Sequence, residues 1–305
     1  MAKNVLSIKD VQKRFFGKTV VDNLSFKVFS GETFGLLGPN GAGKTTTMRM
    51  LMNIIGPDEG EISYNDTPRN AVANYQFGYL PEERGLYPGA FVLEILTYFG
   101  TLNNLTRRKA EVEAIRYLDR LGMVEYTDTK VNELSKGMQQ KIQFIAAFLH
   151  NPDILILDEP FAGLDPINQI VLREMLAEYK QKNKILIIST HQMEQAEQVC
   201  DHICLINQGK VILDGKLDAI KKKSRENAYI LQSDSSLDFL NNFAEIEILE
   251  AGNSTYKFIL KNKIAIAALL KKIETKADIK RFEVVEPSLH DIFITKIQEQ
   301  SKETA

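Results

Sequence analysis

The sequence predicts an α/β fold with a smaller α+β domain towards its C-terminal end, and the apolar pattern supports this prediction. Short, predominantly apolar runs at Thr33–Leu37, Ile154–Leu157 and Ile185–Ile188 have the length of strands and no polar face. Strands of this kind belong to a parallel sheet that is covered on both faces. Helical segments separate them, and this alternation is typical of an α/β domain.

The other segments of the core domain follow in order along the chain. The first thirty residues alternate polar and apolar side chains, which predicts antiparallel strands with one solvated face. A helix at Thr45–Ile54 follows the first buried strand, and residues 84–149 have a mainly helical pattern. We expect a core domain at residues 1–220, with an antiparallel β subdomain and a helical subdomain at about 84–150.

A basic segment, Lys221–Arg225, marks the expected start of a second domain at residues 221–305. A solvated linker is the favoured interpretation of this segment, and contact with anionic lipid is the alternative. The pattern beyond it predicts the split βαβ order β-α-β-β-α-β and a final helix after Pro287. The expected strands are Ala228–Ser233, Glu245–Glu250, Thr255–Leu260 and Ile279–Val285, and the expected helices are Ser236–Phe243 and Lys263–Lys276.

Composition limits the classes of function. The 305 residues carry a net charge of −2, whereas a dedicated nucleic-acid binder has a basic excess, so we expect no nucleic-acid partner. The two cysteines, Cys200 and Cys204, cannot form a disulfide framework, and buried free thiols are favoured over a metal site with His202. We expect no signal peptide, because no apolar core follows the first residues, and no membrane span, because no apolar run approaches about 18 residues; we therefore expect a partner to supply any membrane span.

The segment Gly38–Thr46 fits the pattern G-x-x-x-x-G-K-[ST]. Its glycines allow backbone N–H groups to approach phosphates, and the following helix adds the positive end of its dipole. Lys44 has the reach for the β- and γ-phosphates, and Thr45 offers a hydroxyl to Mg²⁺. An ordinary glycine turn is the alternative, but the position between a strand and a helix argues against it. The expected nucleotide-binding residues are Gly38, Pro39, Asn40, Gly41, Ala42, Gly43, Lys44, Thr45 and Thr46.

Two acids follow the apolar strand at residues 154–157. Asp158 lies at the carboxyl end of the strand, where it can hold the hydration shell of Mg²⁺. Glu159 can take a proton from the attacking water. Solvated acids at a strand end are the alternative. Against it, the phosphate loop binds the phosphates of a nucleotide and the acid holds the Mg²⁺, so the two motifs complement each other. Together they predict a P-loop ATPase.

A second phosphate-binding device precedes the acidic strand, in the segment Leu134–Lys141. Ser135 is placed as the N-cap of a helix, and Gly137 keeps the start of that helix accessible. A helix N-terminus with a free hydroxyl binds phosphate. Because one nucleotide does not need two such devices from one subunit, the pattern indicates a composite site shared across a dimer.

This segment resembles the LSGGQ signature of ABC ATPases, with Lys136 and Met138 replacing a glycine and a glutamine. The resemblance covers about residues 3–220 and implies binding of ATP and Mg²⁺ by a dimer of such subunits. Phe15 resembles the aromatic residue that stacks on adenine, and Phe16 is the alternative.

Two later segments extend the resemblance to ABC ATPases. Phe161–Asp165 is similar to the D-loop, which implies that Asp165 contacts the opposing subunit. Ser189–His191 is similar to the switch segment, which implies that His191 reaches the γ-phosphate. The resemblance therefore implies that Lys44, Glu159 and His191 act together in hydrolysis.

One position departs from the family pattern. The family places a glutamine after the strand near Gly78–Pro81, where it touches Mg²⁺ beside the surface that meets the membrane partner. Glu82 stands at that position here. Because a carboxylate is a good ligand of Mg²⁺, we expect Glu82 to serve the metal together with Thr45 and Asp158.

Three features are similar to the ATP-binding subunits of type-two ABC exporters. They are the segments Tyr79–Pro88, Lys136–Met138 and Pro287–Phe293. This resemblance implies an ATPase at the cytoplasmic face of the cell membrane, paired with an integral-membrane permease and a second ATPase subunit. A soluble ABC ATPase acting on ribosomes or DNA, and a P-loop kinase for small molecules, are the rival hypotheses. The single cassette, the absence of a long heptad run and the signature segment argue against them.

Overall fold

The computed structural model describes residues 3–83, 85–223, 228–252, 254–261, 266–285 and 288–303. The chain forms two compact units, Met1–Lys216 and Leu217–Ala305. The predicted features at Arg84, Ser224, Arg225, Lys263 and Pro287 lie outside the described residues.

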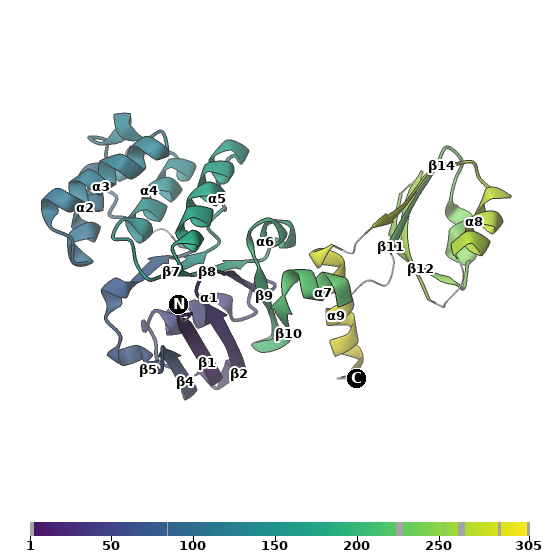
Figure 1. Ribbon diagram of the computed structural model, residues 1–305, viewed down its shortest axis with the longest axis horizontal. Helices are drawn as coiled ribbons and strands as arrows, with labels where there is room; N and C mark the ends of the chain where they lie inside the picture. The colour runs from purple at the N-terminus through teal and green to yellow at the C-terminus, as the bar shows by residue number, and fades with distance from the viewer. Residues whose placement is uncertain are drawn as a thin grey trace. The chain divides into compact units, whose positions relative to one another are not determined.

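A six-stranded sheet with the order β10-β9-β3-β8-β7-β6 forms the centre of the first unit (Figure 1). Its neighbouring strands are parallel except for β10, which runs antiparallel to β9. The three predicted buried strands are confirmed, and the α/β fold class with them. The bounds are β3 (Thr33–Leu37), β6 (Phe77–Leu80), β7 (Ile154–Asp158), β8 (Ile185–Thr190), β9 (His202–Asn207) and β10 (Lys210–Lys216).

The two faces of this sheet contribute to different cores. Ile154 and Ile156 face a core built with α1 and the antiparallel sheet, whereas Leu155 and Leu157 face the helical side. This alternation explains why these strands lack a polar face. The antiparallel sheet has the order β2-β1-β4-β5. The elements of this layer are β1 (Val5–Phe15), β2 (Lys18–Phe29), β4 (Glu59–Tyr64), β5 (Thr67–Pro68) and α1 (Lys44–Leu51).

The opposite face is covered by helices, which lie above the sheet in Figure 1. Gly100 allows close contact between two of them, because a Cβ atom there would lie 2.6 Å from Ala110 Cβ. The helices of the first unit are α2 (Val92–Leu102), α3 (Arg107–Arg120), α4 (Lys136–Phe148), α5 (Pro166–Gln181) and α6 (Met193–Val199). Short 3₁₀ helices lie at η1 (Arg69–Ala71), η2 (Asn74–Gln76), η3 (Val124–Tyr126) and η4 (Val131–Glu133).

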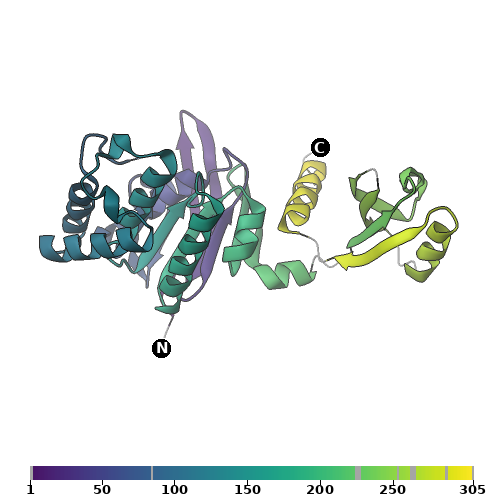
Figure 2. The ribbon, with the colours of Figure 1, turned by 90° about the horizontal axis from the view of Figure 1, so that it is seen from above.

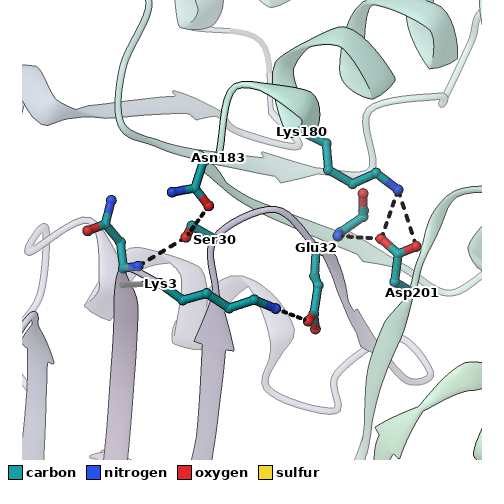
Figure 3. Close-up of polar contacts among 8 residues, drawn as sticks. Lys3, Ser30, Glu32, Lys180, Asn183 and Asp201 are labelled. Carbon is teal, nitrogen blue, oxygen red and sulfur yellow. Dashed lines mark hydrogen bonds and ion pairs between the residues drawn. The ribbon is translucent and has the colours of Figure 1, made fainter. Parts of the chain in front are cut away.

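A polar network fixes the amino end of β3, the end opposite to the phosphate loop (Figure 3). Asp201 accepts a hydrogen bond of 2.8 Å from Thr33 N and forms an ion pair of 3.0 Å with Lys180. Ser30 Oγ, just before the strand, donates to Asn183 Oδ1 at 2.9 Å. The C-terminal end of α5 and the segment that enters β9 are therefore tied to the amino end of β3.

The second unit contains a four-stranded sheet with the order β12-β13-β11-β14, in which all neighbouring strands are antiparallel. Helix α8 packs on one face of this sheet, as both ribbon views show (Figure 1, Figure 2). The predicted strand positions are confirmed to within one residue. The bounds are α7 (Leu217–Lys223), β11 (Ala228–Ser233), β12 (Ile246–Ala251), β13 (Thr255–Leu260), α8 (Ile266–Glu274), β14 (Ile279–Val285) and α9 (Leu289–Glu303).

The predicted helix at Ser236–Phe243 is wrong in type, because the structure has a 3₁₀ helix, η5, at Asp238–Asn242. Its buried side chains, Leu237 and Leu240, are three residues apart, which is the repeat of a 3₁₀ helix. Ser236 Oγ also accepts a hydrogen bond of 3.2 Å from Asp238 N, which favours a tight turn at this point.

Candidate nucleotide-binding site

The phosphate loop connects the carboxyl end of β3 to the N-terminus of α1. Gly43 is the N-cap of α1 and has a left-handed φ of 104°, which favours glycine. At Gly38, where φ is 154°, a Cβ atom would lie 2.2 Å from Ile206 O, so no larger residue fits without moving the backbone. The glycines therefore allow the loop to follow a path that is closed to other residues, and backbone of this kind can bind anions through its N–H groups.

Lys44 is the first residue of α1, its side chain reaches back to the loop, and it is 7% exposed. Its Nζ donates to Gly38 O at 2.9 Å and to Pro39 O at 3.2 Å. Burial lowers the pKa of Lys44, and the negative charges of Glu159, Asp158 and Glu82 oppose this shift. An ammonium held among these groups is suited to bind a phosphate.

A cavity of about 380 Å³ opens at the loop, which is within the range of small-molecule sites. Glu82, distant from the loop in sequence, reaches the same cavity. The structure therefore brings Glu82 together with Lys44 and Thr45. The lining residues are Val20, Asn40, Gly41, Gly43, Lys44, Thr45, Thr46 and Glu82.

Asp158 is the last residue of β7 and is fully buried. Ser189 Oγ donates to Asp158 Oδ1, while Oδ2 has no hydrogen-bond partner among the described residues. Burial raises the pKa of Asp158, and the hydroxyls of Ser189 and Thr45 oppose that shift. A buried carboxylate oxygen without a partner, close to a threonine hydroxyl, fits the hard oxygen ligands that Mg²⁺ requires.

Glu159 follows directly, with a left-handed φ of 49° and 5% exposure. Thr190 Oγ1 donates to Glu159 Oε2 at 3.0 Å. The backbone N–H of His191 donates to Glu159 Oε1 at 2.9 Å, and His191 Nδ1 lies 2.6 Å from the same oxygen. The segment after β8 therefore holds the glutamate in one orientation and places the histidine beside it.

Ser135 and Asp165 are both helix N-caps with exposed side chains. Ser135 Oγ accepts from Met138 N at 3.3 Å, and Asp165 accepts from Asn168 N at 3.0 Å. The two segments are neighbours, since a Cβ atom on Gly137 would lie 3.1 Å from Gly163 O. Within the described part of the chain, neither segment lines the cavity at the phosphate loop.

Phe15 and Phe16 lie at the turn between β1 and β2. Phe15 is 39% exposed, and Lys13 Nζ lies 5.6 Å from the centroid of its ring. Phe16 is fully exposed and has a left-handed φ of 49°. Neither ring is among the described side chains that line the cavity, whereas Val20 is.

The sequence analysis did not assign roles to Val20 or to the hydroxyls of Ser189 and Thr190. The two hydroxyls reach the acids because β7 and β8 are neighbours and Asp158 pairs with Ser189, and the sequence motifs do not show that pairing. Cys200 and Cys204 are buried, and burial raises the pKa of the Cys200 thiol to about 12. Nothing in these contacts favours a metal site at the two thiols.

Comparisons with known proteins agree with this arrangement. The ABC transporter family model matches residues 21–162, and the model of the C-terminal domain of DrrA1-3-like ATP-binding proteins matches residues 215–297. The uncharacterized ABC transporter ATP-binding protein YhaQ of Bacillus subtilis is 41% identical over 96% of this chain and 98% of its own length. The chain belongs to the ATP-binding proteins of ABC transporters. It is an ATPase of that family, with the fold of a P-loop NTPase.

Other members of the family cover the first unit. The Nod factor export ATP-binding protein I of Burkholderia lata is 39% identical over 70% of this chain and 72% of its own. A solved ATP-binding subunit of an ABC transporter is 32% identical, with a TM-score of 0.68, and covers 72% of this chain and 92% of its own. The dimeric cassette MJ0796 shares the fold, with a TM-score of 0.65 at 21% identity.

None of the helices in the described ranges is long and apolar enough to cross a membrane.

Proposed function

We propose that the chain binds Mg-ATP at the phosphate loop and hydrolyses it in a dimer that drives an ABC exporter. The observation that carries this proposal is that Lys44, Thr45 and Glu82 line one cavity and that Asp158 lies beside Lys44 and Thr45. Backbone N–H groups of the loop and Lys44 bind the phosphates, while Phe15 stacks on the adenine. Lys44 exchanges its two carbonyl partners for phosphate oxygens, which are stronger acceptors because they are charged.

The metal ligands in this proposal are Thr45, Asp158 and Glu82. The unpartnered Oδ2 of Asp158 supports the assignment, since a buried carboxylate oxygen without a donor costs free energy until it has a ligand. Bound Mg²⁺ neutralises charge on the β- and γ-phosphates and so makes the phosphorus easier to attack. We expect Glu82→Gln to retain turnover and Glu82→Ala to lose Mg²⁺ affinity, as measured by the Mg²⁺ dependence of ATPase rate.

Hydrolysis depends on Glu159 and His191. Glu159 accepts a proton from water as the water oxygen bonds to the γ-phosphorus, the bond to the bridging oxygen breaks, and ADP leaves. Thr190 and His191 support this role because they hold the carboxylate at 3.0 Å and 2.6 Å. His191 lies beside Glu159, and rotation of its side chain brings it to the γ-phosphate. A hydrogen-bond donor there stabilises the charge that develops during hydrolysis.

The second half of each site comes from a second ATPase subunit. Ser135 and Gly137 of one subunit contact the γ-phosphate held by the other, and Asp165 contacts the opposing phosphate loop region. Three facts support this arrangement: the exposed N-cap hydroxyl of Ser135, its separation from the cavity of its own chain, and the exposed Ile167 and Ile170 beside Asp165. Exposed apolar side chains of this size mark an interaction surface when they cluster.

The partner in transport is an integral-membrane permease, and the ATPase lies at the cytoplasmic face of the membrane. The names of the relatives support this proposal, since they are ATP-binding proteins of ABC transporters and one is an export protein. The alternative of a soluble ATPase acting on ribosomes or DNA has no such support from these relatives.

A complementation assay tests the composite site. Lys44→Ala lacks the phosphate lysine and Ser135→Arg blocks the opposing face, so each variant alone is expected to be inactive. An equimolar mixture forms mixed dimers that contain one intact site, which restores about a quarter of the wild-type ATPase rate for a symmetric dimer. A mixture that stays inactive, although mixed dimers are shown by differential tagging, would count against shared sites. The matched control is Ser135→Ala mixed with wild type, because it changes the same position without adding a bulky side chain.

A further inference from the structure

One face of helix α4 lies along β6 and the loop that follows this strand. Gln143, Ala147 and His150 are spaced by four and three residues, so they follow one another on that face. His150 Nε2 lies 3.0 Å from Phe77 O, and a Cβ atom on Gly78 would lie 2.2 Å from Ala147 O. The C-terminal end of α4 is therefore in close contact with the backbone of β6.

Gln143 extends this contact from the strand to the loop after it. Its Nε2 donates to Pro81 O at 3.3 Å and to Glu83 O at 3.0 Å. These two carbonyls belong to the residues on either side of Glu82. The opposite orientation of the amide would place its oxygen against two other acceptors, so the N–H groups must face the loop. One side chain of α4 thus bridges the backbone across Glu82.

The amide of Gln143 is not explained by packing in the helical core. The residue is 4% exposed, and its Oε1 has no hydrogen-bond partner among the described residues. A buried amide oxygen without a donor costs free energy. A methionine would fill a similar space without that cost. What the amide adds at this position is the pair of N–H donors that hold the loop.

The loop that Gln143 holds carries one of the proposed metal ligands. Glu82 lines the cavity at the phosphate loop together with Lys44 and Thr45. Further along, Leu86 packs against the core of the helical side. Residues that orient a ligand of a metal ion affect its affinity although they do not touch the ion. The contacts of Gln143 are therefore placed to decide where the Glu82 carboxylate points.

We propose that Gln143 is a positioning residue of the metal site: it fixes the backbone on both sides of Glu82, so that the carboxylate faces the space beside Thr45 and Asp158. This inference rests on the proposed role of Glu82 as a ligand of Mg²⁺. Gln143 touches neither the metal nor the nucleotide. Loss of its N–H donors is therefore expected to weaken the contribution of Mg²⁺ to nucleotide binding and to leave the binding of metal-free nucleotide unchanged.

Binding of a fluorescent, non-hydrolysable ATP analogue to the full chain tests the proposal. The Kd with EDTA divided by the Kd with excess Mg²⁺, the Mg²⁺ ratio, measures what the metal contributes. Gln143→Met keeps the length of the side chain without its N–H groups, and we expect the Mg²⁺ ratio to fall about tenfold with the Kd in EDTA unchanged. The control is Tyr179→Phe, which loses a buried bond from a side chain to a backbone carbonyl elsewhere and should alter neither Kd.

A double-mutant cycle shows whether Gln143 acts through Glu82. If it does, Gln143→Met has no further effect on the Mg²⁺ ratio in a chain that already carries Glu82→Ala. Effects that multiply in the double variant would overturn the proposal. A wild-type ratio for Gln143→Met, with a lowered ratio for Glu82→Ala, would also overturn it and leave the metal-ligand role of Glu82 standing. A wild-type ratio for Glu82→Ala would refute that role and this inference together.

Amide hydrogen exchange without nucleotide measures the loop itself. We expect faster exchange in the peptide that covers residues 81–83 of Gln143→Met, and no change there in Tyr179→Phe. Unchanged exchange in this peptide would overturn the proposal. If Gln143→Met does not fold, Gln143→Asn takes its place in both experiments with the same expected results, because its amide is one methylene too short to reach both carbonyls.

Discussion

Asp158→Asn is expected to stabilise the protein without ligands while abolishing ATP turnover. Asp158 is fully buried, its Oδ2 has no described partner, and burial raises its pKa. A raised carboxyl pKa means that the ionised form costs free energy in the folded state at neutral pH. Removing that charge relieves the cost, but it also removes the proposed metal ligand.

The magnitude follows from the contacts at this position. A buried polar atom without a partner costs about 1–3 kcal/mol. Asparagine keeps an oxygen that accepts from Ser189 Oγ, but its amide N–H groups need acceptors of their own, which cancels part of the gain. We therefore expect a net stabilisation of about 1 kcal/mol. For a unit of this size, that raises the melting temperature by about 2–4 °C.

The gain depends on pH in a defined direction. The folded pKa of Asp158 lies above its ordinary value of 3.8, so the wild-type protein regains stability relative to the variant as pH falls through the folded pKa. Below pH 3.8 the carboxyl is protonated in both the folded and unfolded states, and the charge-dependent advantage of Asp158→Asn is gone. At neutral pH the stability advantage of Asp158→Asn over the wild type has its full size.

Differential scanning calorimetry at pH 7.5 and at successively lower pH measures this difference, with and without Mg-ATP. Ligand at 100 times its Kd stabilises the wild type by about 2.7 kcal/mol, and Asp158→Asn should gain much less. Asp66→Asn, at an exposed aspartate, is the control and should change neither quantity. A variant that melts below the wild type at pH 7.5, or a difference that does not change with pH, would show that the buried charge of Asp158 does not destabilise the folded protein.

Three further predictions concern the phosphate loop and two buried side chains that donate to backbone carbonyls. Gly38→Ala places Cβ 2.2 Å from Ile206 O, so binding of a fluorescent ATP analogue should fall by at least about tenfold. Arg69→Met removes hydrogen bonds from a buried guanidinium to three backbone carbonyls and should lower the unfolding free energy by about 2–3 kcal/mol in urea titrations. Tyr179→Phe removes a bond of 2.9 Å to Pro152 O and should cost about 1 kcal/mol by the same measurement. Unchanged midpoints in urea would contradict the last two predictions.

The central sheet could be predicted from the sequence because strands buried on both faces need apolar side chains at every position. Ile154–Leu157 shows this: alternate residues enter different cores. The type of η5 could not be predicted as well, because a short apolar pair such as Leu237 and Leu240 fits both an α-helix and a 3₁₀ helix.

The phosphate loop could be found because its glycines and Lys44 are contiguous in sequence. Contacts between segments distant in sequence were not predictable in the same way. The hydroxyl of Thr190 reaches Glu159 only because β7 and β8 are neighbours, and strand order depends on the packing of the whole domain.

If ATP binding by this chain drives a membrane transporter, the ATP-bound chain is held by an integral-membrane protein, and a capture experiment detects that protein. Tagged Glu159→Gln, which is expected to bind but not hydrolyse ATP, is isolated with Mg-ATP from detergent-solubilised native membranes and its partners are identified by mass spectrometry. Lys44→Ala, captured in the same way, controls for nucleotide dependence. A stoichiometric integral-membrane protein is expected with Glu159→Gln. Ribosomal or DNA-bound proteins in its place, without a membrane protein, would exclude the transporter function.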